Sequence, residues 1–180
     1  MVYILLAAGF EEIEALTPCD LLRRAGVEVA LVGVKDNVVV GSHRIAVQAD
    51  LTLNEVCLDK MDMLVLPGGL RGVQGLLESE EALKLTKSAW EAGKYVCAIC
   101  AGPTILAKLG IIGSQRATCY PGKEPEMGCA QLEPVPVVES GRLITGRAAG
   151  CSVPFALALI KALKGSQEAE RIASQIVWNC

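Results

Sequence analysis

Histidine is almost absent from this chain of 180 residues, in which His43 is the only one. Functions that need two imidazoles, such as a pair of histidine ligands on a zinc ion, are therefore excluded. Aromatic residues are also scarce, at 4%, whereas apolar residues make up 52% and charged residues 21%. This composition excludes a disordered, collagen-like or coiled-coil chain and predicts a core of aliphatic side chains and alanine. The length is that of one domain, which we assign to residues 1–180.

The chain also lacks a positive charge excess and a long hydrophobic run. Its net charge is −3, so we do not expect nucleic acid as a partner. The first apolar run ends at Glu11 and Glu12 without the pattern of a secretory signal. The apolar stretches 98–107 and 151–160 are shorter than the roughly 18 residues of a membrane span. We therefore expect no membrane association and a cytoplasmic location, where thiols stay reduced.

Cysteine is abundant by contrast, and two of the eight cysteines, Cys97 and Cys100, form a CxxC pair. No second close pair or histidine accompanies it, so we expect no metal site. Cys97 falls in an apolar run typical of a buried strand, which places it about 10 Å from Cys100 along the chain. That separation is too large for a disulfide. Seven cysteines are expected to be small core residues: Cys19, Cys57, Cys97, Cys119, Cys129, Cys151 and Cys180.

Apolar runs typical of strands buried on both faces alternate with helical patterns along the chain. We expect strands at 2–7, 28–34, 63–66, 95–99, 116–119, 135–138 and 143–145, and a hairpin at 38–47. Helices are expected at 11–25, 79–92, 103–109, 153–163 and 168–177, and an irregular loop at 120–133. This order predicts an α/β fold with a mostly parallel central sheet and helices on both faces. Ligands bind at the carboxyl ends of such strands, which points to segments 9–14, 67–70, 99–103 and the loop from 119.

The segment Ala98-Ile99-Cys100-Ala101-Gly102-Pro103 joins a predicted buried strand directly to a predicted helix. A residue at such a junction is held in a strained backbone conformation with its side chain over the sheet, as in a nucleophile elbow. The helix dipole is expected to favour the thiolate of Cys100, and the N–H of Ala101 to face an oxyanion formed there. The alternative is that Cys100 is one more buried cysteine.

Two glycines, Gly68 and Gly69, follow the strand expected at 63–66. Consecutive glycines allow another part of the backbone to approach closely and can turn N–H groups inward. The same residues are also compatible with an ordinary tight turn.

Three acidic residues open the first predicted helix. Glu11 and Glu12 are expected to be helix caps or surface charges. Glu14 lies near Ile13 and Leu16, which we expect to face the core, so its carboxyl could be half-buried with a raised pKa. The spacing alone leaves a purely structural role for Glu14 open.

These segments occur together in one order: EEIEALTP, DLLRRAG, LPGG, AICAGP and GCSVPFALALIKAL. In this combination the chain resembles, nearly end to end, the ThiJ/PfpI superfamily and in particular its DJ-one-like branch. The resemblance implies a flavodoxin-like three-layer sandwich and a homodimer. It also implies that Cys100 is the reactive cysteine and that Glu14 is the acid hydrogen-bonded to it. Gly69, with Gly68 beside it, and Ala101 correspond to the backbone donors of the oxyanion pocket.

The chain departs from this family at one position. Many members have a histidine before a proline in the loop near the cysteine, and Tyr120 occupies that position here. A phenol has a pKa of about 10 and is a poor general base at neutral pH. A Cys-His peptidase is therefore not expected. The remaining histidine, His43, lies in the predicted hairpin and is expected at the surface or in a dimer contact.

Two functions from different classes remain. The first is a glyoxalase or deglycase without a cofactor, acting on small aldehydes or glycated adducts, with Cys100 as nucleophile and Glu14 as general acid/base. The second is a redox-sensing or chaperone-like stress protein without enzymatic activity. In that case oxidation of Cys100 would carry the signal, because an accessible, acidic thiol is oxidised first.

Overall fold

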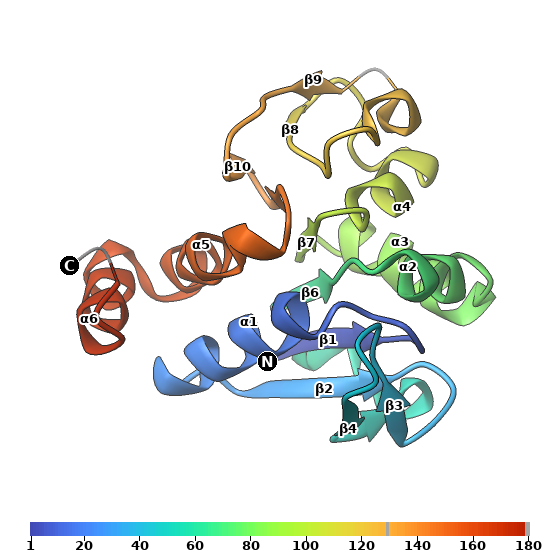
Figure 1. Ribbon diagram of the computed structural model, residues 1–180, viewed down its shortest axis with the longest axis horizontal. Helices are drawn as coiled ribbons and strands as arrows, with labels where there is room; N and C mark the ends of the chain where they lie inside the picture. Colours follow the sequence, from blue (N-terminus) through green and yellow to red (C-terminus); the bar gives the residue numbers. More distant parts are fainter. Residues whose placement is uncertain (129, 179–180) are drawn as a thin grey trace.

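A computed structural model describes residues 1–128 and 130–178, which are arranged around a seven-stranded sheet (Figure 1). The strand order is β10-β11-β7-β6-β1-β2-β5, and every neighbouring pair is parallel except β10 and β11. The strands are β1 (Val2–Leu6), β2 (Val29–Gly33), β5 (Leu51–Thr52), β6 (Met63–Leu66), β7 (Tyr95–Ile99), β10 (Val137–Ser140) and β11 (Leu143–Gly146). The mostly parallel sheet predicted from the apolar runs is confirmed.

Helices cover both faces of this sheet. One face carries α1 (Glu12–Arg24), α5 (Ser152–Lys164) and α6 (Ser166–Gln175), and the other carries α2 (Leu70–Leu77), α3 (Glu80–Glu91) and α4 (Pro103–Lys108). The described residues also form four 3-10 helices: η1 (Leu53–Glu55), η2 (Leu58–Lys60), η3 (Glu124–Met127) and η4 (Ala149–Cys151). The predicted flavodoxin-like three-layer sandwich is thereby confirmed. No helix within residues 1–128 and 130–178 combines the length and apolarity that a membrane crossing needs.

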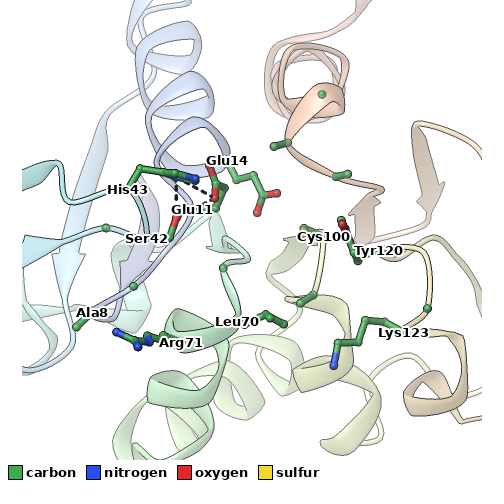
Figure 2. Close-up of a pocket in the computed structure, with 18 of the residues that line it drawn as sticks. Ala8, Glu11, Glu14, Ser42, His43, Leu70, Arg71, Cys100, Tyr120 and Lys123 are labelled. Carbon is green, nitrogen blue, oxygen red and sulfur yellow. Dashed lines mark hydrogen bonds and ion pairs between the residues drawn. The ribbon is translucent and has the colours of Figure 1, made fainter.

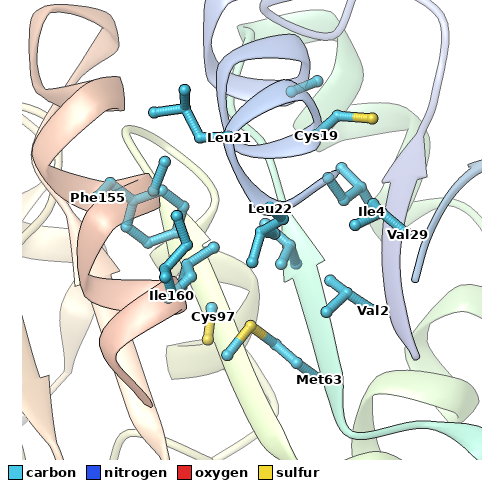
Figure 3. Close-up of a cluster of buried hydrophobic side chains, with 14 of the residues drawn as sticks. Val2, Ile4, Cys19, Leu21, Leu22, Val29, Met63, Cys97, Phe155 and Ile160 are labelled. Atoms are coloured by element: carbon cyan, nitrogen blue, oxygen red, sulfur yellow. The ribbon is translucent and has the colours of Figure 1, made fainter. Parts of the chain in front are cut away.

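The central strands are apolar throughout because successive side chains enter different cores. In β1, Ile4 packs with α1 and α5, whereas Tyr3 and Leu5 pack on the opposite face. Figure 3 shows the first of these cores, with Phe155 of α5 packed near Leu22 of α1. Burial on two sides removes the polar alternation that a half-exposed strand would have.

The six described cysteines, Cys19, Cys57, Cys97, Cys100, Cys119 and Cys151, are free thiols. Cys19, Cys97 and Cys119 are buried, as expected of small core residues, whereas Cys57 and Cys151 are only half-buried. Cys129 and Cys180 lie outside the described residues.

Some elements differ from the sequence expectation. The predicted hairpin is present as β3 (Val38–Val40) and β4 (Ala46–Gln48), but it forms its own sheet, as do β8 (Arg116–Ala117) and β9 (Gln131–Leu132). The helix α2 was not expected, since Gly72 and Gly75 lower its helix propensity. Gly72 is needed there because a Cβ would lie 2.7 Å from the Cα of Phe10. Tertiary packing therefore overrides local propensity in α2.

The chain order creates a crevice at the carboxyl ends of β1 and β6. These strands are neighbours, yet β1 continues into α1 on one face and β6 continues into α2 on the other. The two connections touch through backbone hydrogen bonds, from Glu11 N to Gly68 O at 3.0 Å and from Gly72 N to Gly9 O at 3.2 Å. Ligands of open α/β sheets bind at such a switch point.

Candidate functional site

Cys100 stands between the last residue of β7 and the start of α4 with a φ of 65°. This left-handed conformation costs a residue with a side chain about 1 kcal/mol. Two hydrogen bonds hold it, from Cys100 N to Gly146 O at 2.9 Å and from Tyr120 N to Cys100 O at 2.8 Å. The strained strand-to-helix junction predicted from the sequence is confirmed.

Gly69 brings a second backbone segment against this cysteine. Its φ is 86°, and a Cβ at this position would lie 2.4 Å from Gly9 O. The turn is therefore restricted to glycine by both conformation and space. The backbone N–H groups of Gly69 and Ala101 favour the charged form of Cys100, since both act to lower the pKa of its thiol. Two donors are therefore available near the place where negative charge would develop.

Glu14 reaches the same point from α1 and is fully buried. Its Oε2 accepts a hydrogen bond from Gly68 N at 2.8 Å, while its Oε1 has no hydrogen-bond partner within the described part of the chain. A Cβ on Gly68 would lie 2.5 Å from Glu14 Oε2 and 2.7 Å from Cys100 Cβ. The carboxyl and the cysteine therefore both pack against Gly68. Burial raises the pKa of Glu14 to about 7, which is the direction expected from the sequence.

The expected lowering of the thiol pKa by the helix dipole is wrong. Burial and the neighbouring Glu14 charge raise the pKa of Cys100 to about 12, against the opposing effect of the Ala101 and Gly69 N–H groups. The helix α4 has only 6 residues, so its dipole is small. When Glu14 carries a proton, its charge no longer opposes the thiolate, and its O–H can donate to sulfur. The two groups therefore titrate as a pair that shares one proton.

The buried Glu14 carboxyl makes the stability of the protein depend on pH. Its pKa is about 7 in the folded chain against an ordinary 4.5, so its contribution is complete below pH 4.5 and is lost as the pH rises through 7. The shift corresponds to as much as about 3 kcal/mol. In urea unfolding, the free energy of unfolding of Glu14→Gln minus that of the parent should therefore be larger at pH 8 than at pH 4.5, by up to that amount. An equal difference between the two proteins at both pH values would contradict this.

Glu12 is a buried anchor, which corrects the expectation that it is a cap or surface charge. It is 4% exposed, and it accepts hydrogen bonds from His43 N at 2.7 Å and from Ser42 Oγ and His43 Nδ1 at 3.0 Å. Although burial opposes its charge, hydrogen bonds from its own N–H, His43 and Ser42 lower its pKa to about 2. Ile13, expected to face the core, is 54% exposed. Helical spacing misses this because the donors come from the distant β3-β4 hairpin.

Removal of the Glu12 carboxylate should loosen the turn between β3 and β4. Glu12→Ala leaves the His43 N–H without its acceptor and the Ser42 hydroxyl with Glu11 as its remaining carboxylate acceptor, at a cost of about 1–3 kcal/mol in the free energy of unfolding. Because the pKa of Glu12 is depressed to about 2, the difference from the parent should shrink as the pH falls from 4.5 toward 2. Glu80→Ala, in the exposed first turn of α3, is the matched control for urea unfolding. A cost no greater than in that control would contradict the anchoring role.

A pocket of about 1190 Å³ opens above Cys100 and Glu14. Of the residues expected at the site, Cys100, Glu14, Gly69, Ala101 and Tyr120 line it, and Gly68 lies beneath them. Figure 2 shows Glu14 and Cys100 facing the same space, with Tyr120 beside the cysteine and the His43 hairpin across from it. Tyr120 is 47% exposed. The expected site is therefore brought together in one pocket.

Further wall residues come from the hairpin at 40–44, the start of α2 at 70–71, the loop at 121–123 and the segment 148–150. The rule that ligands bind at strand ends indicates Leu70 and the loop after 119. The hairpin, Arg71 and the segment 148–150 were not expected from the sequence. His43 lies at the rim with its side chain 69% exposed, which confirms the expected surface position.

One group of side chains has a spacing that could hold a metal ion. In the part of the chain that the structure describes, only Glu11, Glu12 and His43 offer three ligand atoms within 4.8 Å of one another. The oxygens of Glu12 already accept hydrogen bonds from His43 and Ser42. These hydrogen bonds satisfy the carboxylate without an ion.

The chain is similar to several known proteins. The sequence profile of the DJ-1/PfpI family matches residues 1–162. The protein dj-1beta of Drosophila melanogaster is 35% identical over 177 residues, covering 97% of this chain and 95% of that relative. A deglycase of Pyrococcus abyssi is 36% identical over 165 residues, covering 91% and 99%. The solved structure of oxidised DJ-1 from Toxoplasma gondii superposes with a TM-score of 0.94 at 30% identity, covering 99% and 98%.

Proposed function

The chain belongs to the DJ-1/PfpI family, and on that basis we propose that it is a cofactor-independent enzyme of the glyoxalase and deglycase type. Its substrates would be small reactive aldehydes or their adducts. The observation that carries the proposal is the buried Glu14 carboxyl packed with the Cys100 thiol against Gly68. The deglycase of Pyrococcus abyssi, similar over 99% of its length, supports the reaction class.

In the first step the Cys100 thiolate adds to the aldehyde carbon of methylglyoxal. A sulfur–carbon bond forms, and the carbonyl electron pair moves to oxygen. The resulting oxyanion is stabilised by the N–H groups of Gly69 and Ala101. Protonated Glu14 then gives its proton to this oxygen, which yields a hemithioacetal. A carboxyl with a pKa near 7 suits this transfer at neutral pH.

In the next steps the Glu14 carboxylate moves a proton between adjacent carbons. It removes the proton from the hemithioacetal carbon to form an enediolate. The hydroxyl proton moves from the former aldehyde oxygen to the ketone oxygen, and Glu14 returns its proton to the neighbouring carbon, which leaves a thioester of a 2-hydroxy acid on Cys100. Water then hydrolyses the thioester and regenerates the thiol. The sum is methylglyoxal plus water to lactate, with no external oxidant or reductant. Tyr120, at the pocket wall, can donate a hydrogen bond but does not replace a basic imidazole.

The same thiol can act on adducts of methylglyoxal with amines. The thiolate attacks the adduct carbon, a sulfur–carbon bond forms, the carbon–nitrogen bond breaks, and the amine leaves with the proton of Glu14. This is the deglycase form of the reaction. Its leaving group is larger, and the pocket of about 1190 Å³ has room for it.

The test is a lactate assay on the full chain with methylglyoxal, without glutathione and in a buffer free of amines. We expect lactate to form in proportion to protein concentration over many turnovers. Heat-unfolded protein at the same concentration is the control, because it retains the thiols but not the site. Lactate no faster than in that control would contradict the enzymatic proposal.

A second function is redox sensing by Cys100. It is favoured by Glu14 Oε1, which has no hydrogen-bond partner within the described part of the chain. A protonated carboxyl there could donate a hydrogen bond to an oxidised Cys100 and hold it as sulfinate. This redox-sensing role, whether or not it extends to a chaperone-like one, needs no general base. Mild peroxide treatment followed by mass spectrometry tests it. Addition of two oxygens to Cys100 no faster than to Cys57 or Cys151 would contradict it.

We further propose that the protein is a cytoplasmic homodimer. The free thiols at all six described cysteines suit a reducing compartment. Exposed apolar side chains on α1 and on β3-β4, namely Ile13, Val38, Val40 and Ile45, offer a surface for a second copy. Light scattering during size-exclusion chromatography should give twice the chain mass of 19.0 kDa, and a single species at the chain mass would contradict the dimer.

A further inference from the structure

The walls of the Cys100 pocket carry more positive than negative charge. The two acidic residues on the walls are Glu11 and Glu14, and Glu14 together with Cys100 holds one negative charge when the pair keeps a single proton. The basic residues outnumber the acidic ones: His43, Arg44, Arg71 and Lys123. Basic side chains on the walls can therefore bind an anionic ligand where they have no acidic partner of their own.

Two of these four basic groups already have partners. Lys123 Nζ pairs with Glu126 at 2.6 Å, and His43 Nδ1 pairs with Glu12 at 3.0 Å. Arg44 and Arg71 form neither an ion pair nor a side-chain hydrogen bond with any residue in 1–128 or 130–178. These two guanidinium groups are available to a ligand.

Arg71 is the better placed of the two. It lies two residues after Gly69, whose N–H acts to lower the pKa of the Cys100 thiol. Its Cβ packs so closely on Gly9 that a Cβ on that glycine would lie 2.5 Å away, which fixes the base of the side chain. Arg44 projects from the β3-β4 turn in a left-handed conformation with a φ of 68°. The rigid attachment of Arg71 lowers the entropic cost of binding a ligand there.

Arg71 lies on the boundary between two cavities. Arg71 and Ala8 line both the Cys100 pocket and a second cavity of about 270 Å³ at the ends of β1 and β2. In Figure 2 the guanidinium of Arg71 is beside Ala8, on the side of the pocket away from Cys100. A ligand that reaches both Cys100 and Arg71 must therefore extend across the pocket.

We propose that Arg71 is a specificity-determining residue that binds a carboxylate on the substrate, separated by a spacer from the aldehyde that reacts at Cys100. The planar guanidinium binds a carboxylate through two parallel hydrogen bonds. One free guanidinium on this wall matches the single charge of a carboxylate better than the near-double charge of a phosphate ester. The pocket, at about 1190 Å³, exceeds what a three-carbon aldehyde requires. This inference rests on the proposed function for its reaction but not for the binding of the anion.

The first experiment compares 4-carboxyphenylglyoxal with phenylglyoxal, which share the reacting group and differ by the carboxylate. We expect the parent protein to have the higher kcat/KM for the carboxylate, and this preference to fall as salt is raised from 20 to 300 mM. In Arg71→Gln the ratio of the two kcat/KM values should fall about tenfold, and Arg71→Lys should keep part of it. Arg44→Gln should retain the ratio of the parent.

A second experiment reads anion binding without turnover. The Cys100 thiolate is alkylated with 4-(bromomethyl)benzoate or with the neutral 4-(bromomethyl)benzamide, and the rates at Cys100 are followed by mass spectrometry. The sulfur forms a bond to the benzylic carbon, bromide leaves, and the thiol proton goes to solvent. The alkylation rate with the anionic agent, divided by the rate with the neutral agent, should fall in Arg71→Gln and keep the parent value in Arg44→Gln. Thermal unfolding confirms that both variants are folded.

The outcomes separate the two proposals. Absence of turnover with either glyoxal in the parent contradicts the enzymatic function, while a lowered alkylation ratio in Arg71→Gln still supports anion binding. A parent protein that shows no preference for the anionic alkylating agent overturns the inference about Arg71. An unchanged ratio in Arg71→Gln, or a ratio lost in Arg44→Gln instead, overturns it as well.

Discussion

Cys100→Ala is expected to lower kcat for the conversion of methylglyoxal to lactate by at least about a thousandfold. The thiol forms the covalent bond on which each later step depends, and no other side chain of the pocket offers a comparable nucleophile. The Gly69 and Ala101 N–H groups remain in this variant, but they only stabilise charge that no longer develops. Initial rates of lactate formation at saturating substrate provide the measurement.

Cys57→Ala is the matched control for this experiment. Cys57 is also a half-buried free thiol, but it does not line the pocket. Its replacement should leave kcat within about twofold. Turnover that falls less than tenfold in Cys100→Ala would contradict Cys100 as the nucleophile.

Glu14→Gln is expected to lower kcat by about 10²- to 10⁴-fold, the range for loss of a general acid/base. The amide still offers an oxygen to the Gly68 N–H, which Glu14 Oε2 accepts at 2.8 Å, and it has nearly the volume of the carboxyl. The loss therefore reports proton transfer and not a collapsed site. Glu80→Gln, on the exposed start of α3, serves as the control.

The pH profile gives this prediction a second readout. In the parent the active form holds one proton between Glu14 and Cys100, so kcat/KM should rise through pH 7, where the pair loses its first proton. In Glu14→Gln only the thiol titrates, and burial, the largest cause of its raised pKa, remains. The rise should therefore move to higher pH. A profile unchanged from the parent would show that Glu14 does not take part in proton transfer.

The fold was predictable where a local pattern determines it. Runs such as 63–66 and 95–99 are apolar throughout, and burial between two helix layers explains why. The junction at Cys100 was predictable from the residues around it. A strand ends just before it, and two small residues and a proline follow, which is the pattern of a tight turn into a helix. The helix α2 was not, because its Gly72 is required by contact with Phe10 and not by its own segment.

The placement of the site residues was predictable from the sequence, and their electrostatics was not. The position of Cys100 follows from the strand-to-helix junction, and that of Glu14 follows from the resemblance to the family. The raised thiol pKa does not, because it depends on burial and on a carboxyl from a distant helix. The buried state of Glu12 likewise depends on donors from a hairpin 31 residues further along the chain. Interactions of this range leave no periodic signal in the sequence.

The left-handed backbone of Cys100 lowers the stability of the protein, whereas the thiol at this position is needed for the reaction. Glycine is the residue that this conformation favours, so Cys100→Gly should relieve about 1 kcal/mol of strain while abolishing any thiol chemistry. A lineage released from the need for the reaction could therefore become more stable by a single substitution at this position. The identity of residue 100 in a descendant chain would then record whether the chemistry was still under selection.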